Sequence, residues 1–232
     1  MTTVQDALEM ALAARRVARR EGLTWDRFLV RLSGYKFVRK LGEWVSRWTG
    51  KAVKMGTVLD RVRTYHEQVI GKNLTRLTER LISGQLSLPD WQERVALELR
   101  QGRQVLTVFG RGGREAVTYA DWGRMGARLK QDYKRIDLLA QQVANGEISE
   151  AQMRNQLRQI ADSVVSSWHD AERQAKKESE KYTEERRVLS PVEHCVDCEG
   201  YAAEGWQPLG YFPPPTIGSR CDGNCACSME FK

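Results

Sequence analysis

The five cysteines of this chain all lie within its last forty residues, in two groups separated by a loop rich in glycine and proline. Cys195 and Cys198 form a C-x2-C hook, and Cys221, Cys225 and Cys227 form a C-x3-C-x-C group further on. A C-x2-C turn brings two thiolates to one side, and a second group can complete a tetrahedral metal shell. Because the tail has few apolar residues, metal binding would have to fold it in place of a core. The spacing therefore predicts a structural zinc site.

Disulfides and incidental free cysteines are the alternatives to zinc. Disulfides suit secreted chains, but no apolar signal segment begins this sequence and an odd cysteine count leaves one thiol unpaired. Free cysteines usually scatter through apolar cores, whereas these lie in a polar, turn-rich tail. We expect one structural zinc ion per chain. Its predicted ligands are Cys195, Cys198, Cys221 and either Cys225 or Cys227. His194 is a sixth candidate, although the neighbour of a ligand usually points away from the metal.

The positive charge of the chain is concentrated near its N-terminus. The net charge is +7, and residues 1–80 carry 17 Lys and Arg against 8 Asp and Glu, whereas residues 81–232 carry 20 against 22. Such an excess favours contact with a polyanion as much as it favours a solvated basic surface. The arginines expected to face nucleic acid non-specifically are Arg15, Arg16, Arg19 and Arg20. No uninterrupted apolar stretch approaches eighteen residues, so no membrane partner is expected.

The rest of the chain has the pattern of helices. Apolar residues recur every three or four positions. Two corners share one design, in which Gly84 precedes a cap at Ser87 and Gly146 precedes a cap at Ser149. The predicted helices cover residues 3–21, 24–34, 35–48, 57–82, a segment beginning after Ser87, 119–144, and a final helix from Ser149 to Arg187. We find no convincing strand before residue 188 and expect a short hairpin around residues 211–215.

We therefore expect a mainly α fold, with a multi-helix body, a long C-terminal helix and a small, loop-rich, zinc-bound tail. The predicted regions are a basic N-terminal helical segment (residues 1–50), a helical body with a long terminal helix (51–187) and a Cys-rich zinc-binding tail (188–232). The second half of the final helix is almost wholly charged, so it needs a partner to persist. The glycine-rich stretch at residues 109–114 lacks the Lys-Ser/Thr ending of a P-loop and is expected to be a flexible surface loop.

Signatures of catalysis are absent from the sequence. The chain contains no His-Glu-x-x-His motif and no Gly-x-Ser-x-Gly motif. A catalytic zinc keeps an open position, whereas a set of four thiolates closes the shell. A metal-dependent hydrolase or nuclease would also need a general base, and the acidic residues of the tail have no catalytic spacing. The sequence therefore favours a protein that is not an enzyme.

The C-terminal part of the chain resembles the minor head proteins of tailed bacteriophages, the phage Mu F-like head-morphogenesis family. The matching motifs are the C-x2-C hook at Cys195, a Gly/Pro-rich loop, and Asn224-Cys225-Ala226-Cys227 near the end. The upstream helical part is also similar, so the resemblance covers about residues 105–232. The matching stretches there are Gly112-Gly113-Arg114, Asp121-Trp122 and the Gly146-Glu147-Ile148-Ser149 corner. Many relatives have His where this chain has Cys221, and Arg where it has Ala226.

The resemblance implies a low-copy structural protein of the virion head or neck, present in the host cytoplasm during assembly. Its implied partners are the portal and the major capsid protein, with possible contact to packaged DNA, and its implied role is head assembly or DNA delivery. The alternative is a zinc-containing nucleic-acid-binding regulatory protein. Such a regulator should carry a basic recognition helix beside its zinc hook, but after Arg187 the tail has only Arg220 and Lys232 as basic residues.

Overall fold

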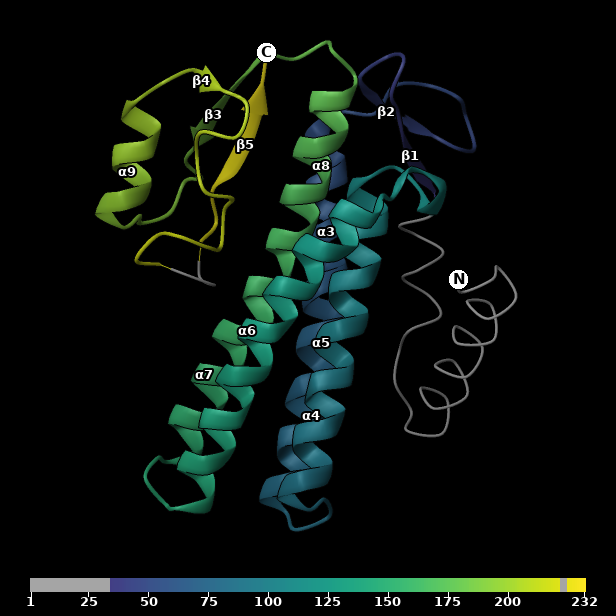
Figure 1. The fold of residues 1–232 in the computed structure, drawn as a ribbon. Coiled ribbons are helices and arrows are strands. Elements are labelled where there is room, and N and C mark those ends of the chain that lie inside the picture. The colour runs from purple at the N-terminus through teal and green to yellow at the C-terminus, as the bar shows by residue number, and fades with distance from the viewer. Residues whose placement is uncertain (1–33, 222–224) are drawn as a thin grey trace.

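The computed structural model describes residues 34–221 and 225–232, and this part of the chain is mainly helical, as predicted. Its helices form an elongated antiparallel bundle (Figure 1). They are α3 (Met55–Tyr65), α4 (Lys72–Ile82), α5 (Leu88–Gly110), α6 (Tyr119–Ala144), α7 (Glu150–Asp162) and α8 (Ser166–Glu178). A π-helical segment, His66–Gly71, joins α3 to α4, and a 3-10 turn, Ser163–Val165, joins α7 to α8. Each of these pairs therefore runs as one rod beside α5 and α6.

The two predicted corners lie at the same end of the bundle, the end farthest from the tail (Figure 1). Gly84 and Gly146 have φ values of +72° and +68°, which residues with a Cβ rarely adopt. Ser87 caps α5 by accepting the Asp90 N–H, and Ser149 caps α7 in a complete capping box. The local cap chemistry therefore fixes where these helices begin.

The predicted helix from Ser149 to Arg187 is wrong in two places. The 3-10 turn interrupts it, because Arg103 of α5 binds the turn: its guanidinium donates to the Ser163 carbonyl at 3.3 Å and pairs with Asp132 of α6. The helix then ends at Glu178, and strand β3 (Glu184–Val188) follows. Glu185 and Arg187 are buried at alternate positions of β3, which is the period of a strand and not of a helix. The charged stretch thus forms the centre of a sheet.

The predicted helix over residues 35–48 is also wrong. Strands β1 (Tyr35–Val38) and β2 (Glu43–Ser46) form an antiparallel hairpin in which Phe37 lies opposite Trp44. Both of these side chains are buried, and the Trp44 ring packs on Phe109 of α5 with 4.9 Å between centroids. Aromatic and β-branched residues fit a pleated, half-buried surface better than a helix, which explains the difference. The rest of the predicted N-terminal helical segment, residues 1–33, lies outside the described part.

The glycine-rich stretch at residues 109–114 is packed and is not the flexible surface loop that we expected. Arg111 is 1% exposed, and its guanidinium donates to both carboxylate oxygens of Glu178 at 2.7 and 2.8 Å. Gly112 has φ of +83°, and a Cβ added there would lie 2.7 Å from the Phe37 carbonyl oxygen. The missing side chain at Gly112 therefore allows the β1–β2 hairpin to sit against the end of α5.

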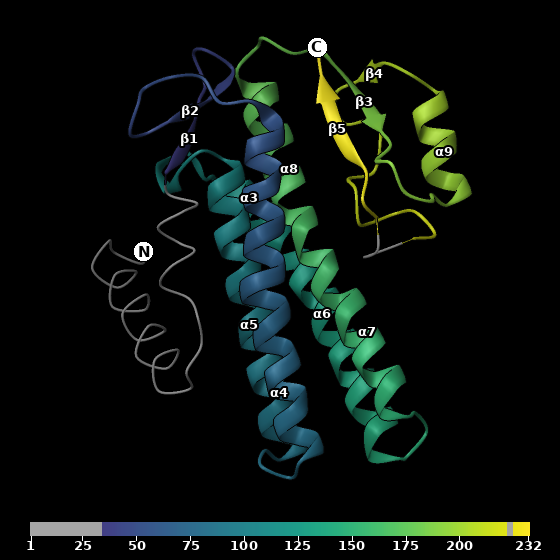
Figure 2. The ribbon, with the colours of Figure 1, turned by 180° about the vertical axis from the view of Figure 1, so that it is seen from behind.

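The tail forms a small unit beside the C-terminal half of α8 (Figures 1 and 2). A three-stranded antiparallel sheet has the order β4 (Gln207–Pro208), β3, β5 (Ser228–Phe231), and helix α9 (Val196–Ala203) precedes β4. The hairpin expected around residues 211–215 is absent from this described segment, which runs as a loop with Phe212 buried. The hairpin β1–β2 lies on the opposite side of α8 from the tail in both views.

Candidate metal centre in the tail

The C-x2-C hook is built on the N-terminus of α9. Cys195 is the N-cap residue of this helix, and Cys198 lies in its first turn with no exposed surface. The positive end of the helix dipole therefore lies at the hook, where it favours thiolates, while burial raises the pKa of the Cys198 thiol. Cys221 comes from the loop that follows β4, and Cys225 and Cys227 lie immediately before β5. The fold thus brings together all five cysteines that the sequence singled out.

The sulfur atoms lie at distances that suit metal coordination. Cys198 Sγ is 3.5 Å from Cys221 Sγ and 3.6 Å from Cys225 Sγ. Tetrahedral zinc with Zn–S bonds of about 2.3 Å separates its sulfurs by about 3.8 Å. All five thiols are free, so no disulfide links them. The cluster could hold a metal ion and is compatible with zinc.

Within the described residues the cysteines form two groups of potential ligands. Cys195, Cys198 and Cys221 make the first group, and Cys198, Cys225 and Cys227 make the second. All sulfurs within one group lie within 4.8 Å of one another. Cys198 belongs to both groups, so the hook is the point at which the two cysteine motifs meet.

The thiols differ in acidity because they lie so close together. Burial would raise the pKa of Cys195, but hydrogen bonds from the Cys198 backbone N–H and the Cys221 thiol lower it to about 7. A hydrogen bond from the Cys227 thiol lowers the pKa of Cys225 to about 4, and the same contact raises the pKa of Cys227. The lowered pKa favours the thiolate form of Cys225, and thiolates are the form that binds zinc. Metal binding would displace the protons that remain.

His194 contacts one cysteine of the cluster, Cys227, but belongs to neither group of potential ligands in the described residues. Its Nδ1 atom lies 3.5 Å from Cys227 Sγ, and its Nε2 atom lies 2.6 Å from the Ser190 carbonyl oxygen. Sequence reasoning missed this contact because only the fold brings Ser190 and Cys227 to the two ring nitrogens. The spacing of residues 194 and 195 alone carries no signal for it.

Contacts from the helical body reach the cluster. Arg63 of α3 donates to the Ala226 carbonyl oxygen at 3.3 Å, and Ser190 Oγ donates to the same atom. Within the tail, the Arg220 backbone N–H donates to Asp197 at 2.7 Å, which ties the loop before Cys221 to α9. These bonds hold the two cysteine motifs in place from both sides.

The other candidate residues of the sequence are not part of this centre. Arg15, Arg16, Arg19 and Arg20, expected to face nucleic acid, lie outside the described residues 34–221 and 225–232. In the described part, no helix has the length and apolar character needed to cross a bilayer.

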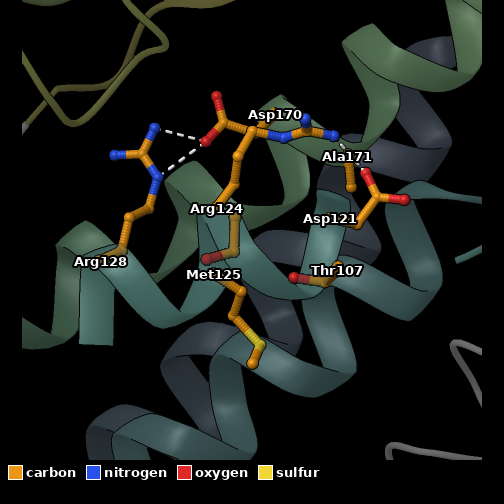
Figure 3. A pocket seen from close by; sticks show the side chains of 8 residues that line it. Thr107, Asp121, Arg124, Met125, Arg128, Asp170 and Ala171 are labelled. Carbon is orange, nitrogen blue, oxygen red and sulfur yellow. Dashed lines mark hydrogen bonds and ion pairs between the residues drawn. The ribbon is translucent and has the colours of Figure 1, made fainter. Parts of the chain in front are cut away.

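A small pocket lies between α5, α6 and α8, with room for about one water molecule (Figure 3). Its charged side chains already have partners. Arg124 donates to Asp121 at 2.5 Å, and Arg128 Nε donates to Asp170 at 2.7 Å. These ion pairs hold the first turn of α6 in place and join α6 to α8. Because the charged groups already have partners and the space is small, the pocket has the features of a packing defect and not of a substrate site.

Comparison of the chain with protein-family models, with curated proteins and with solved structures finds no match.

Proposed function

We propose that this chain is a structural minor head protein of a tailed phage, associated with the portal or the inner capsid face. In this proposal zinc stabilises the fold of the tail, and the helical body positions the tail to bind a partner protein. The observation on which the proposal depends most is the convergence of both cysteine motifs of the family-like C-terminus on one cluster beside Cys198. The two cysteine motifs are more than twenty residues apart in sequence. In this proposal they meet because both supply ligands to one metal centre.

The docking of the tail on the bundle also supports a structural role. Lys176 and Tyr182 both bond the Gly42 carbonyl oxygen, so the segment leading into the tail is tied to the β1–β2 hairpin as well as to α8. Lys181 adds a bond of 2.9 Å to Glu43. A module fixed to a rod at several points suits assembly with other proteins better than it suits a moving catalytic lid.

The alternative, a zinc-containing nucleic-acid-binding regulator, is disfavoured by α9. This helix lies beside the zinc hook, where a regulator would place its recognition helix. Asp197 and Glu199 are in its first turn, and it contains no Lys or Arg. An acidic helix repels the phosphate backbone, so any contact with packaged DNA would come from elsewhere in the chain.

The proposal is tested in purified particles of a phage that carries this gene. We expect the chain to be present at far fewer copies than the major capsid protein, measured by quantitative mass spectrometry. Deletion of residues 190–232 should give defective or non-infectious heads. Val196→Ser, an exposed change next to the hook, serves as a matched control and should leave infectivity intact. Absence from particles, or phosphodiester or peptide turnover by the isolated protein that is lost in Cys225→Ala, would contradict the proposal.

A further inference from the structure

The hairpin β1–β2 and the turn that follows it carry a basic surface. Residues 34–54 contain six Lys and Arg against one Glu, and all six basic residues are exposed. The glutamate, Glu43, is paired with Lys181 at 2.9 Å, and Arg39 is paired with Glu178 at 3.2 Å. These two ion pairs leave a clear excess of positive charge on this part of the molecule.

An exposed tryptophan lies within the basic surface. Trp48 lies between Arg47 and Lys51 in residues 47–51, all of which are exposed, and we call this segment the basic turn. Trp48 is 70% exposed, and an edge contact with Tyr35, with 6.3 Å between ring centroids, holds the indole in place. Tryptophan and arginine are over-represented among the residues that contribute most to protein–protein binding. The basic turn therefore has the features of an interface.

The tail has the opposite charge. Residues 188–232 contain six Asp and Glu against two Lys and Arg. Glu199 is exposed on α9, and Glu204 is exposed at the C-cap of the same helix. The Tyr211 hydroxyl hydrogen-bonds Glu204, which raises the pKa of the tyrosine, and its ring packs edge-on against Phe212 at 5.0 Å between centroids. Tyr211 is 58% exposed, and we call Glu199, Glu204 and Tyr211 the acidic face.

The basic turn and the acidic face belong to opposite sides of the molecule. The hairpin and the tail lie on opposite sides of α8, and α9 is the part of the tail farthest from α8 in both views (Figures 1 and 2). Helix α8 therefore separates the two surfaces within one chain. A two-fold dimer would place each patch against its own copy and bring like charges together, whereas a head-to-tail contact places each patch against its complement.

We propose that the chain associates head to tail with further copies of itself, the basic turn of one copy against the acidic face of the next. Nucleic acid would also be attracted to the basic turn, but the chain itself supplies a matching negative surface with its own exposed aromatic residue. Trp48 and Tyr211 supply most of the affinity, because exposed ion pairs contribute little each. The charges set the orientation and make association depend on salt. This inference goes beyond the proposed function.

The test is the molar mass of the full chain, measured by sedimentation equilibrium between about 50 and 500 mM salt. We expect oligomers at low salt that dissociate as the salt concentration rises. Arg47→Glu with Lys51→Glu reverses the basic turn, and Glu199→Lys with Glu204→Lys reverses the acidic face. Each reversal alone should weaken self-association by about tenfold or more, because like charges then meet across the contact. An equal mixture of the two variants should associate again, since every contact in it can pair opposite charges.

The matched control is Lys130→Glu with Lys134→Glu, two exposed changes on α6 that alter the net charge as much as reversal of the basic turn does. This control should associate like the wild-type chain. Helical circular dichroism checks that each variant is folded. If α9 does not tolerate its two changes, reversal of the basic turn decides the test by itself.

Three outcomes would overturn the inference. The first is a wild-type chain that is monomeric at low salt, which leaves the proposed function intact because that function is tested by presence in particles. The second is an equal loss of association in the control, which would show that net charge alone is responsible. The third is a monomeric chain whose DNA binding is lost in Arg47→Glu with Lys51→Glu, which would assign the basic turn to nucleic acid.

Discussion

Arg173 of α8 and Glu185 of β3 form a buried ion pair that joins the helical body to the tail. Arg173 Nε lies 2.8 Å from Glu185 Oε2, and the glutamate has no exposed surface. Phe212 closes the arrangement, because its N–H donates to Glu185 at 3.1 Å and its carbonyl accepts from Arg173 at 2.9 Å. The tail is therefore attached to the body by a buried ion pair and two backbone hydrogen bonds, in addition to the contacts within its cysteine cluster.

Removing the charge of Glu185 should weaken this attachment strongly. Glu185→Gln leaves Arg173 buried without its counter-charge, which costs about 3–5 kcal/mol in comparable sites. We expect faster proteolysis within the tail and a lower denaturant midpoint. The control is Glu230→Gln, which breaks the exposed pair of Glu230 with Arg186, the neighbour of Glu185 on β3. That pair is screened by solvent, so its loss should cost less than about 1 kcal/mol. Equal effects in the two variants would contradict the role given to the buried pair.

Glu172 should make stability depend on pH near neutrality. Burial raises the pKa of this carboxyl to about 7, against the lowering effects of Lys176 and of the hydrogen bond from Trp44 Nε1. The folded-state pKa is above the ordinary value of 4.5. The contribution of Glu172 to the free energy of unfolding is therefore complete below pH 4.5 and is lost as the pH rises through 7. We expect Glu172→Gln to remove this dependence, which has a limiting slope of about 1.4 kcal/mol per pH unit. Parallel curves of unfolding free energy for the two proteins between pH 5 and 8 would refute the assignment.

His169 should have the opposite effect at acid pH. Burial, followed by the charges of Arg187, Arg173 and Arg63, lowers its pKa to about 3. A folded-state pKa below the ordinary value of 6.5 gives a contribution that is present above pH 6.5 and is lost as pH falls toward 3. In the folded protein the ring should therefore still be neutral at pH 5. Imidazole NMR shifts measure this directly, and a titration midpoint near 6.5 would show that the ring is not buried among these arginines.

A side chain at residue 112 should displace the hairpin. Gly112→Ala places a Cβ 2.7 Å from the Phe37 carbonyl and also forces φ of +83° on a residue that disfavours it. Gly50→Ala is the matched control, since Gly50 has φ of +67° and open space where the Cβ would lie. Gly50→Ala should lower the free energy of unfolding only through its unfavourable positive φ, by about 1–2 kcal/mol. Thermal unfolding should show a clearly larger loss for Gly112→Ala, and a loss no greater than that of the control would mean that the contact with Phe37 is unimportant.

The sequence alone predicts that arginines in the basic N-terminal third bind DNA non-specifically. Replacing Arg15, Arg16, Arg19 and Arg20 by Gln should abolish any DNA binding by the chain, which we expect to be weak, independent of sequence and steeply dependent on salt. Fluorescence anisotropy at several salt concentrations, with two unrelated DNA sequences, checks this. Replacement of Lys130, Lys134 and Arg135 on α6 is the control for loss of positive charge elsewhere. Binding that is selective for one sequence, or insensitive to salt, would contradict the prediction.

The sequence by itself determined the features that depend on near neighbours. The caps at Ser87 and Ser149 are formed within four residues of chain, so their motifs suffice to place the starts of α5 and α7. The spacing of Cys195 and Cys198 similarly requires only one turn at the start of α9. In these cases every interacting group is specified locally.

Tertiary structure decided the features that depend on distant partners. Residues 184–188 are nearly all charged, yet they form β3 because β5, some forty residues later, supplies the ladder. Arg173 forms an ion pair with the buried Glu185, and the Phe212 N–H donates to it. A sequence-based prediction does not contain those partners, so it extends the preceding helix through the charged segment. The direction of His194 was likewise set by its contacts with Ser190 and Cys227. A buried polar group is stable only where the whole fold provides its partner, and a local pattern does not contain that information.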